Sequence, residues 1–209
     1  MQSDAAMEVR QALADLAEVR DRLATVQRFD GYSGTAAIAS GIVAVTAGIV
    51  QAAVAPSPHG ALERQQYLII WLTCLGIALA LNYGAILVWR ARNRNAQAAS
   101  QFRTVGMSIV PAIAAGGAIT LGLLQRGLDE LLPAMWCATY ALGLFASRAM
   151  VPREVVYVAV AFGAVATILL LAPAVNPLAW WIMPLAFGGG QIAIGAIVLA
   201  DLHERTPTR

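Results

Sequence analysis

Residues 67–89 read YLIIWLTCLGIALALNYGAILVW, a stretch of 23 positions without a charged side chain. An α-helix needs roughly 20 apolar residues to cross the ~30 Å hydrocarbon core of a bilayer, so this segment predicts a membrane-spanning helix. Five further stretches meet or approach the same requirement. The predicted spans are residues 35–55, 67–89, 105–124, 131–147, 155–172 and 178–200. The sequence therefore predicts an all-α membrane protein built as a bundle of six transmembrane helices.

The composition agrees with a protein whose main solvent is lipid. Apolar residues make up 59% of the chain and charged residues only 12%, whereas soluble domains carry about a quarter charged residues. The net charge of +2 is too small to indicate a nucleic-acid partner. All 14 basic residues are arginine. Because the chain has no lysine, a Schiff base with retinal or pyridoxal phosphate is excluded.

The arginines predict how the bundle is oriented. If the N-terminus is cytoplasmic, twelve arginines lie on the cytoplasmic side and only Arg64 and Arg126 lie outside. Basic residues in short connectors favour the cytoplasmic side of a membrane. We therefore expect both termini in the cytoplasm. The predicted organisation is a cytoplasmic helix over residues 1–28, a transmembrane domain over residues 29–203 and a cytoplasmic tail over residues 204–209.

A recurring pattern along the spans suggests three helical hairpins. Trp71, Trp136 and Trp180 each lie near the start of a span that later carries small residues. One interpretation is three consecutive two-helix units in an approximately threefold arrangement. The alternative is a bundle without an internal repeat.

The N-terminal segment is amphipathic. Residues 5–28 contain neither Gly nor Pro, and their apolar residues recur with alternating steps of three and four. These residues are Val9, Ala12, Leu16, Val19, Leu23 and Val26. The spacing is that of a heptad seam. Three interpretations stay open: a helix lying on the inner leaflet, association with a second copy of the chain, or docking of another protein.

Polar side chains at depth are the first places to look for function in a membrane bundle. The predicted spans hold no ionisable group near the bilayer centre, where a charge costs at least ~2.5 kcal/mol, which argues against a proton pump or charge-coupled carrier. Asn82 and Gln191 are the notable uncharged polar residues at depth. They are candidates for an interhelical hydrogen bond or, alternatively, for contacts to a ligand.

The sixth span also carries a candidate helix break. Pro184 is followed by Gly188, Gly189 and Gly190, a combination that can kink a helix and free backbone carbonyls. The alternative is close helix packing, for which Ala186 with Gly190 and Gly189 with Ala193 have suitable small-xxx-small spacing.

Catalytic and cofactor sites find little support in the residues. The two histidines, His59 and His203, are predicted on opposite sides of the membrane, so they cannot share a metal or haem. The two cysteines, Cys74 and Cys137, lie in apolar stretches without a charge to stabilise a thiolate. No metalloprotease, nucleophile-elbow or phosphate-loop motif occurs. We expect a protein that is not an enzyme and that has no cofactor or metal.

Two short segments carry a resemblance. Residues 28–34 read RFDGYSG and residues 187–191 read FGGGQ, ahead of Gly195. In these motifs the chain resembles a loose group of uncharacterised small bacterial six-helix membrane proteins, which often have a histidine where this chain has Gln191. The resemblance implies a location in the bacterial cytoplasmic (inner) membrane and brings no catalytic residues.

Two functional hypotheses follow from the sequence. In the first, the protein is a non-enzymatic membrane subunit or anchor that self-associates or holds a partner at the inner leaflet. In the second, it binds or transports a small molecule or lipid at a site between the third and sixth spans, near Gln191. The missing buried charge favours the first.

Overall fold

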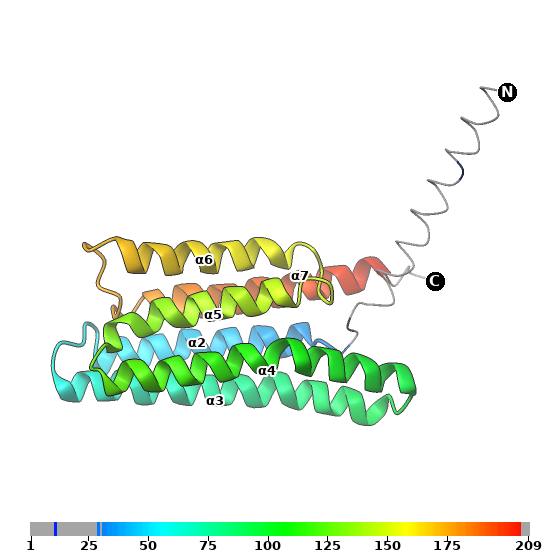
Figure 1. Cartoon of the computed structure of the whole chain (residues 1–209), viewed down its shortest axis with the longest axis horizontal. Coiled ribbons are helices and arrows are strands. Elements are labelled where there is room, and N and C mark those ends of the chain that lie inside the picture. The colour runs from blue at the N-terminus through cyan, green and yellow to red at the C-terminus, as the bar shows by residue number, and fades with distance from the viewer. Residues whose placement is uncertain (1–10, 12–28, 30, 206–209) are drawn as a thin grey trace, which may run out of the picture.

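The computed structural model describes residues 11, 29 and 31–205. Within them all regular structure is helical, and no strand occurs. The elements are α2 (Gly34–Val54), α3 (Ala61–Arg92), α4 (Ala96–Gln125), the 3-10 helix η1 (Asp129–Leu131), α5 (Leu132–Ala146), α6 (Val155–Leu171), the π-helix η2 (Pro184–Gly188) and α7 (Gly189–Arg205). The long helices lie side by side along one common axis and alternate in direction (Figure 1). The predicted all-α fold is confirmed for this part of the chain.

Three of these helices are long and apolar enough to cross a membrane. They are α2, α3 and the continuous helix Pro184–Glu204, which η2 and α7 form together. They coincide with the first, second and sixth predicted spans. The second half of α4, Val110–Gln125, and α6 are also apolar but shorter. The apolar helices indicate a membrane protein.

Helices α3 and α4 begin well before the predicted spans 67–89 and 105–124. The reason is local capping. The Glu63 carboxylate accepts hydrogen bonds from the backbone N–H groups of His59 (2.9 Å) and Gly60 (3.5 Å). The Asn95 side chain accepts one from the N–H of Ala98 (2.7 Å). Such caps satisfy the free N–H groups of a first turn, so both helices begin before their apolar runs.

The sixth helix begins later than the predicted residue 178. Residues 172–181 form turns. The Leu178 N–H donates to Asn176 Oδ1 (3.0 Å), and the Trp180 N–H donates to the carbonyl oxygen of Pro56 (3.0 Å). Because these backbone groups are bound outside a helical ladder, the chain stays irregular here until Ile182.

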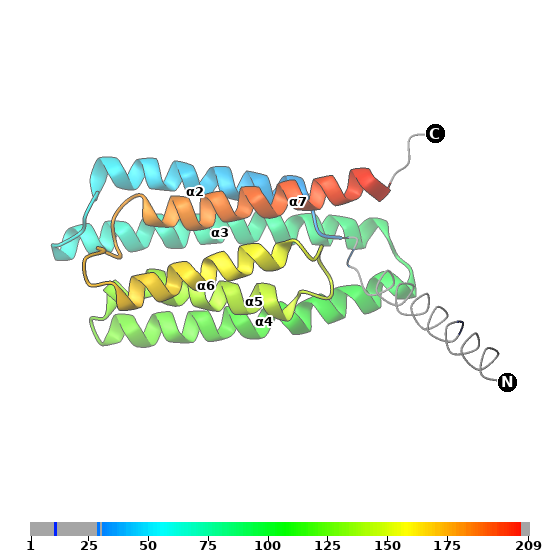
Figure 2. The same cartoon turned by 90° about the horizontal axis from the view of Figure 1, so that it is seen from above.

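The helices form two groups of three (Figure 2). In the first group α2 packs along both α3 and α7, and also against η2. In the second group α5 packs along both α6 and α4. Between the groups, α6 meets α7 and α3 meets α4 over shorter stretches. We call the first group, which comprises α2, α3, η2 and α7, the terminal group. The second, which comprises α4, η1, α5 and α6, is the central group. The interface between the two groups is called the seam.

Glycines allow α2 and α7 to pack in close contact. Three glycines spaced seven residues apart on α2 face small residues at the start and middle of the last helix. The facing pairs are Gly34 with Gly195, Gly41 with Gly188, and Gly48 with Pro184. A Cβ atom at Gly34 would lie 2.7 Å from the carbonyl oxygen of Gly195, and one at Gly48 would overlap the Pro184 ring. Close backbone approach of this kind is a main source of helix association in lipid.

Of the three consecutive hairpins that one interpretation of the sequence expects, the last pairs α6 with α7. α6 contacts the last helix where Gly190 meets the ring of Phe162 and where Val155 packs with Ile194 and Val198, whereas α7 packs more extensively along α2. Of the small residues expected to mediate close packing of the last helix, Ala186 and Gly190 both pack with Phe162 of α6. Gly190 lies against the ring of Phe162, whereas a Cβ at Gly189 would meet no atom within 4 Å.

Candidate functional site

Asn82 connects two helices of the terminal group. Its Nδ2 donates to Ser40 Oγ on α2 (2.7 Å) and to the carbonyl oxygen of Ala78 (2.9 Å). Ser40 Oγ in turn donates to the carbonyl oxygen of Ala36 (2.8 Å). The bond to Ser40 therefore joins α3 to α2, whereas the bond to Ala78 lies within α3.

Gln191 connects the two groups of helices. Its Nε2 donates to the hydroxyl of Tyr140 on α5 (2.7 Å). Its Oε1 is buried and has no hydrogen-bond partner among the described residues. Asn82 and Gln191 therefore bind different partners, and the Oε1 of Gln191 is a buried acceptor without a partner among the described residues.

Three aromatic rings lie beside this contact. The rings of Tyr140, Phe162 and Phe187 have centroids 4.7 to 5.4 Å apart in tilted or edge-on arrangements. A Cβ at Gly190 would lie 2.5 Å from Cε2 of Phe162, so only glycine lets that ring approach the last helix. The Gln191–Tyr140 hydrogen bond is thus adjacent to a packed aromatic cluster.

The candidate helix break coincides with η2. Pro184 cannot donate an amide hydrogen bond, and a π-helix inserts extra backbone that changes which face each residue presents. Pro184 and Gly188 face α2, next to Gly48 and Gly41. Phe187 contacts the aromatic cluster on the opposite group. The π-helix therefore serves both interfaces of the last helix.

The most completely buried polar side chain, Gln51, was missed by sequence reasoning. It is 0% exposed and uses both ends of its amide. Its Nε2 donates to the carbonyl oxygens of Leu178 (2.8 Å) and Ala55 (3.3 Å), and its Oε1 accepts from Trp71 Nε1 (2.8 Å). Gln51 lies near the end of its span, where a polar residue is expected to face headgroups. The available signal was Trp71 at a similar depth on the next helix.

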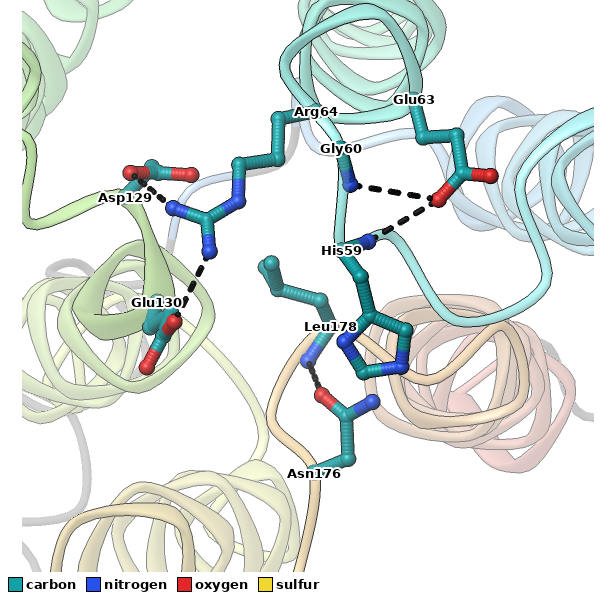
Figure 3. Close-up of polar contacts among 8 residues, drawn as sticks. All are labelled: His59, Gly60, Glu63, Arg64, Asp129, Glu130, Asn176 and Leu178. Atoms are coloured by element: carbon teal, nitrogen blue, oxygen red, sulfur yellow. Dashed lines mark hydrogen bonds and ion pairs between the residues drawn. The ribbon is translucent and has the colours of Figure 1, made fainter.

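Charged side chains cluster at the end of the bundle where α3 begins (Figure 3). Arg64 reaches from α3 to η1 and forms ion pairs with Asp129 (3.3 Å) and Glu130 (3.1 Å). The Asp129 side chain is 12% exposed. The hydrogen bonds from the N–H groups of His59 and Gly60 lower the pKa of Glu63. Arg64 therefore connects the terminal and central groups at this end of the seam.

The second sequence hypothesis placed a site between the third and sixth spans, 105–124 and 178–200. The principal neighbour of α4 is α5, and that of α7 is α2. The residues around Gln191 come from α5, α6 and η2 instead. Gln191 thus has its neighbours on helices other than the third span, since the glycine contacts with α2 direct α7 away from α4.

The remaining candidates are dispersed. His59 lies before α3, whereas His203 lies near the end of α7, so they occupy opposite ends of the bundle. Cys74 and Cys137 are free and buried. No group of three or more metal-ligating side chains occurs in the described part of the chain. The heptad positions predicted in the N-terminal segment lie outside the described residues. They are Val9, Ala12, Leu16, Val19, Leu23 and Val26.

The site with the clearest unused binding capacity is therefore the amide of Gln191, between the two helix groups. Comparison with known proteins adds no family to this description: no family model, curated protein or solved structure matches the chain.

Proposed function

We propose that this chain crosses a bacterial inner membrane six times, with both termini in the cytoplasm, and acts as a non-enzymatic membrane subunit or anchor. Residues 1–28 would hold a partner protein or a second copy of the chain at the inner leaflet. The bundle would supply the attachment to lipid.

The carrying observation is the segregation of arginines to one end of the bundle. The α3–α4 turn, the α5–α6 connector, the start of α2 and the end of α7 lie at the same end in Figure 1. The arginines of the segments that meet there are Arg90, Arg92, Arg94, Arg103, Arg148, Arg153 and Arg205. Arg64 and Arg126 belong to the opposite end, and Arg64 is paired with two carboxylates. This distribution supports a cytoplasmic location of the arginine-rich end.

Helix lengths are compatible with six crossings. At 1.5 Å per residue, the 15 residues of α5 and the 17 of α6 span about 22 and 26 Å. Both fall short of the ~30 Å hydrocarbon core, but a short helix in a bundle is accommodated by local thinning at a modest cost. The 30 residues of α4 exceed the requirement.

An anchoring role also fits the polar side chains. Gln51, Trp71, Asn82 and Ser40 use their polar atoms in bonds between helices. Such bonds stabilise a bundle by roughly 0.6–2 kcal/mol each, and none of these residues is ionisable. These four side chains therefore support assembly of the bundle rather than chemistry.

Native mass measurement after gentle detergent extraction tests this proposal. The full chain is expected to purify with a second copy or a protein partner, and a variant lacking residues 1–27 is expected to lose it while remaining inserted. The double substitution Leu16→Asp with Leu23→Asp should have the same effect, because both residues belong to the apolar heptad positions of the N-terminal segment. Gln11→Asp, which lies outside those heptad positions, is the matched control. Equal association with and without residues 1–27 would contradict the anchoring role.

A further inference from the structure

Hydrogen bonds cross the seam at separate levels along the bundle. Arg64 binds Asp129 and Glu130 at one end. Gln191 binds Tyr140 within the bundle. The Phe29 N–H donates to the carbonyl oxygen of Met150 (3.0 Å) at the arginine-rich end. Unlike the α2–α7 contact, in which backbones meet, the seam is bridged largely by long side chains.

Every buried side-chain polar atom that lacks a hydrogen-bond partner among the described residues belongs to a residue at this seam. These atoms are Arg64 Nε, Tyr67 OH, Tyr83 OH, Asp129 Oδ2 and Gln191 Oε1. Arg64, Asp129 and Gln191 make the bonds across the seam. Tyr67 belongs to a buried cluster against which Trp136 of α5 packs, and Tyr83 packs in a cluster that also contacts Met150.

Polar groups away from the seam behave differently. Within the terminal group, Gln51 and Asn82 bond to neighbouring helices or turns. Within the central group, Trp136 Nε1 donates to Thr120 Oγ1 (2.9 Å). The atoms without a partner are therefore not scattered through the bundle but confined to one interface.

The chemistry of these atoms selects a small neutral ligand. They comprise an N–H donor, two acceptor oxygens and two hydroxyls, so their common partner must both donate and accept hydrogen bonds. The rings of Tyr140, Phe162 and Phe187 pack against one another near Gln191, which favours a small ligand over a bulky one. Buried polar atoms of this kind are ordinarily satisfied by ordered water, which makes about three hydrogen bonds per molecule.

We propose that the seam binds a series of ordered water molecules between the two helix groups. One position lies at the end of the seam where Arg64 Nε, Asp129 Oδ2 and the hydroxyl of Tyr67 lack partners. A second lies at Gln191 Oε1 beside the Tyr140 hydroxyl, and a third at the hydroxyl of Tyr83. The interface between the two helix groups is thus hydrated at these positions.

Hydroxyl-radical labelling of the full chain in lipid nanodiscs, read out by mass spectrometry, tests the proposal, because buried side chains are labelled where bound water supplies the radical. Tyr67 is 1% exposed, and Trp71, one turn further along α3, is 3% exposed. Trp71 is the internal control, since its Nε1 is bonded to Gln51. We expect Tyr67 to be labelled several-fold more than Trp71. Labelling of Tyr67 no greater than that of Trp71 would overturn the proposal.

A substitution tests the second position independently. Gln191→Leu removes the unpartnered oxygen and is expected to lower labelling of Tyr140 several-fold while leaving Tyr67 unchanged. Asn82→Leu removes an amide bonded within the terminal group and should leave Tyr140 unchanged. Undiminished labelling of Tyr140 in Gln191→Leu would show that no water binds there. If that variant fails to insert into the membrane, the ratio of Tyr67 labelling to Trp71 labelling in the native chain decides the proposal.

Discussion

Two glutamines show how differently one side chain is used in this bundle. Gln51 is fully buried, and its amide joins α2 to α3 and to the turn before η2. Gln191 makes one bond, to Tyr140, and keeps a free acceptor. The first amide is saturated by the protein and stabilises the terminal group. The second amide, at the interface between the groups, uses its Nε2 in a hydrogen bond but not its Oε1.

Replacing Gln51 by leucine should therefore be costly. The change leaves Trp71 Nε1 and the carbonyl oxygen of Leu178 buried without a partner, and we expect a loss of about 2 kcal/mol in the free energy of unfolding. Reversible unfolding in mixed micelles measures it. Adding Trp71→Phe should recover part of the loss, because the indole donor is then also removed. A loss below about 0.5 kcal/mol in the single variant would contradict the role given to Gln51.

A pH dependence is expected at the first turn of α3. The pKa of Glu63 is lowered from its ordinary value of 4.5 by the N–H groups of His59 and Gly60. A lowered folded-state pKa means that the carboxylate stabilises the fold above the unfolded value and loses this contribution as pH falls through the folded value. Glu63→Gln should then be less stable than the native chain at pH 7 and equally stable below the lowered pKa. Thermal unfolding at both pH values checks this, and an equal difference at both would refute it.

At the scale of elements, the first and last described long helices, α2 and α7, approach each other closely. Gly34, Gly41 and Gly48 of α2 meet the last helix at heptad spacing. The same last helix contacts the central group through Phe187 and Gln191, on its other side. The π-helix between Pro184 and Gly188 permits both, because it alters the rotation of the helix between its two contacts.

Two alanine substitutions in α7 distinguish the effect of close packing on stability from the effect of helix propensity. A Cβ at Gly195 would lie 2.5 Å from the carbonyl oxygen of Gly34, whereas one at Gly189 meets nothing within 4 Å. Gly195→Ala should destabilise the bundle by about 1–3 kcal/mol, the usual cost of overpacking. Gly189→Ala should be neutral or stabilising, since alanine favours a helix over glycine. Equal effects of the two in unfolding measurements would contradict the packing.

At the scale of the whole molecule, the two ends of the bundle differ in charge. The end with the α3–α4 turn carries most of the arginines, and the other carries Glu63, Asp129 and Glu130. Under the proposed orientation, a cysteine replacing exposed Gln97 is labelled from the cytoplasmic side, and one replacing exposed Ser57 from the opposite side. Native Cys74 and Cys137 are 8% and 0% exposed, so their background should be low. Labelling of both introduced cysteines from the same side would refute the orientation.

Sequence reasoning predicted the helices better than their partners. Hydropathy located α2 within one residue at either end, because uninterrupted apolar runs are visible in the chain itself. It did not show that Gly34 faces Gly195, since that depends on the rotation of two helices far apart in sequence. The partner of Gln191 was hidden for a related reason. The π-helix before it changes its direction, and a π-helix has no sequence signature beyond Pro184 and the glycines.

The pairing of α2 with α7 has a consequence for biosynthesis. Gly34 and Gly195 are separated by about 160 residues, which a ribosome adds in roughly 8–30 s at 5–20 residues per second. During that interval the glycine face of α2 has no native partner. A nascent or truncated chain that stops before α7 would present this face to lipid, or to whichever insertase or protease handles unfinished membrane proteins. Completion of the last helix is thus the event that closes the molecule.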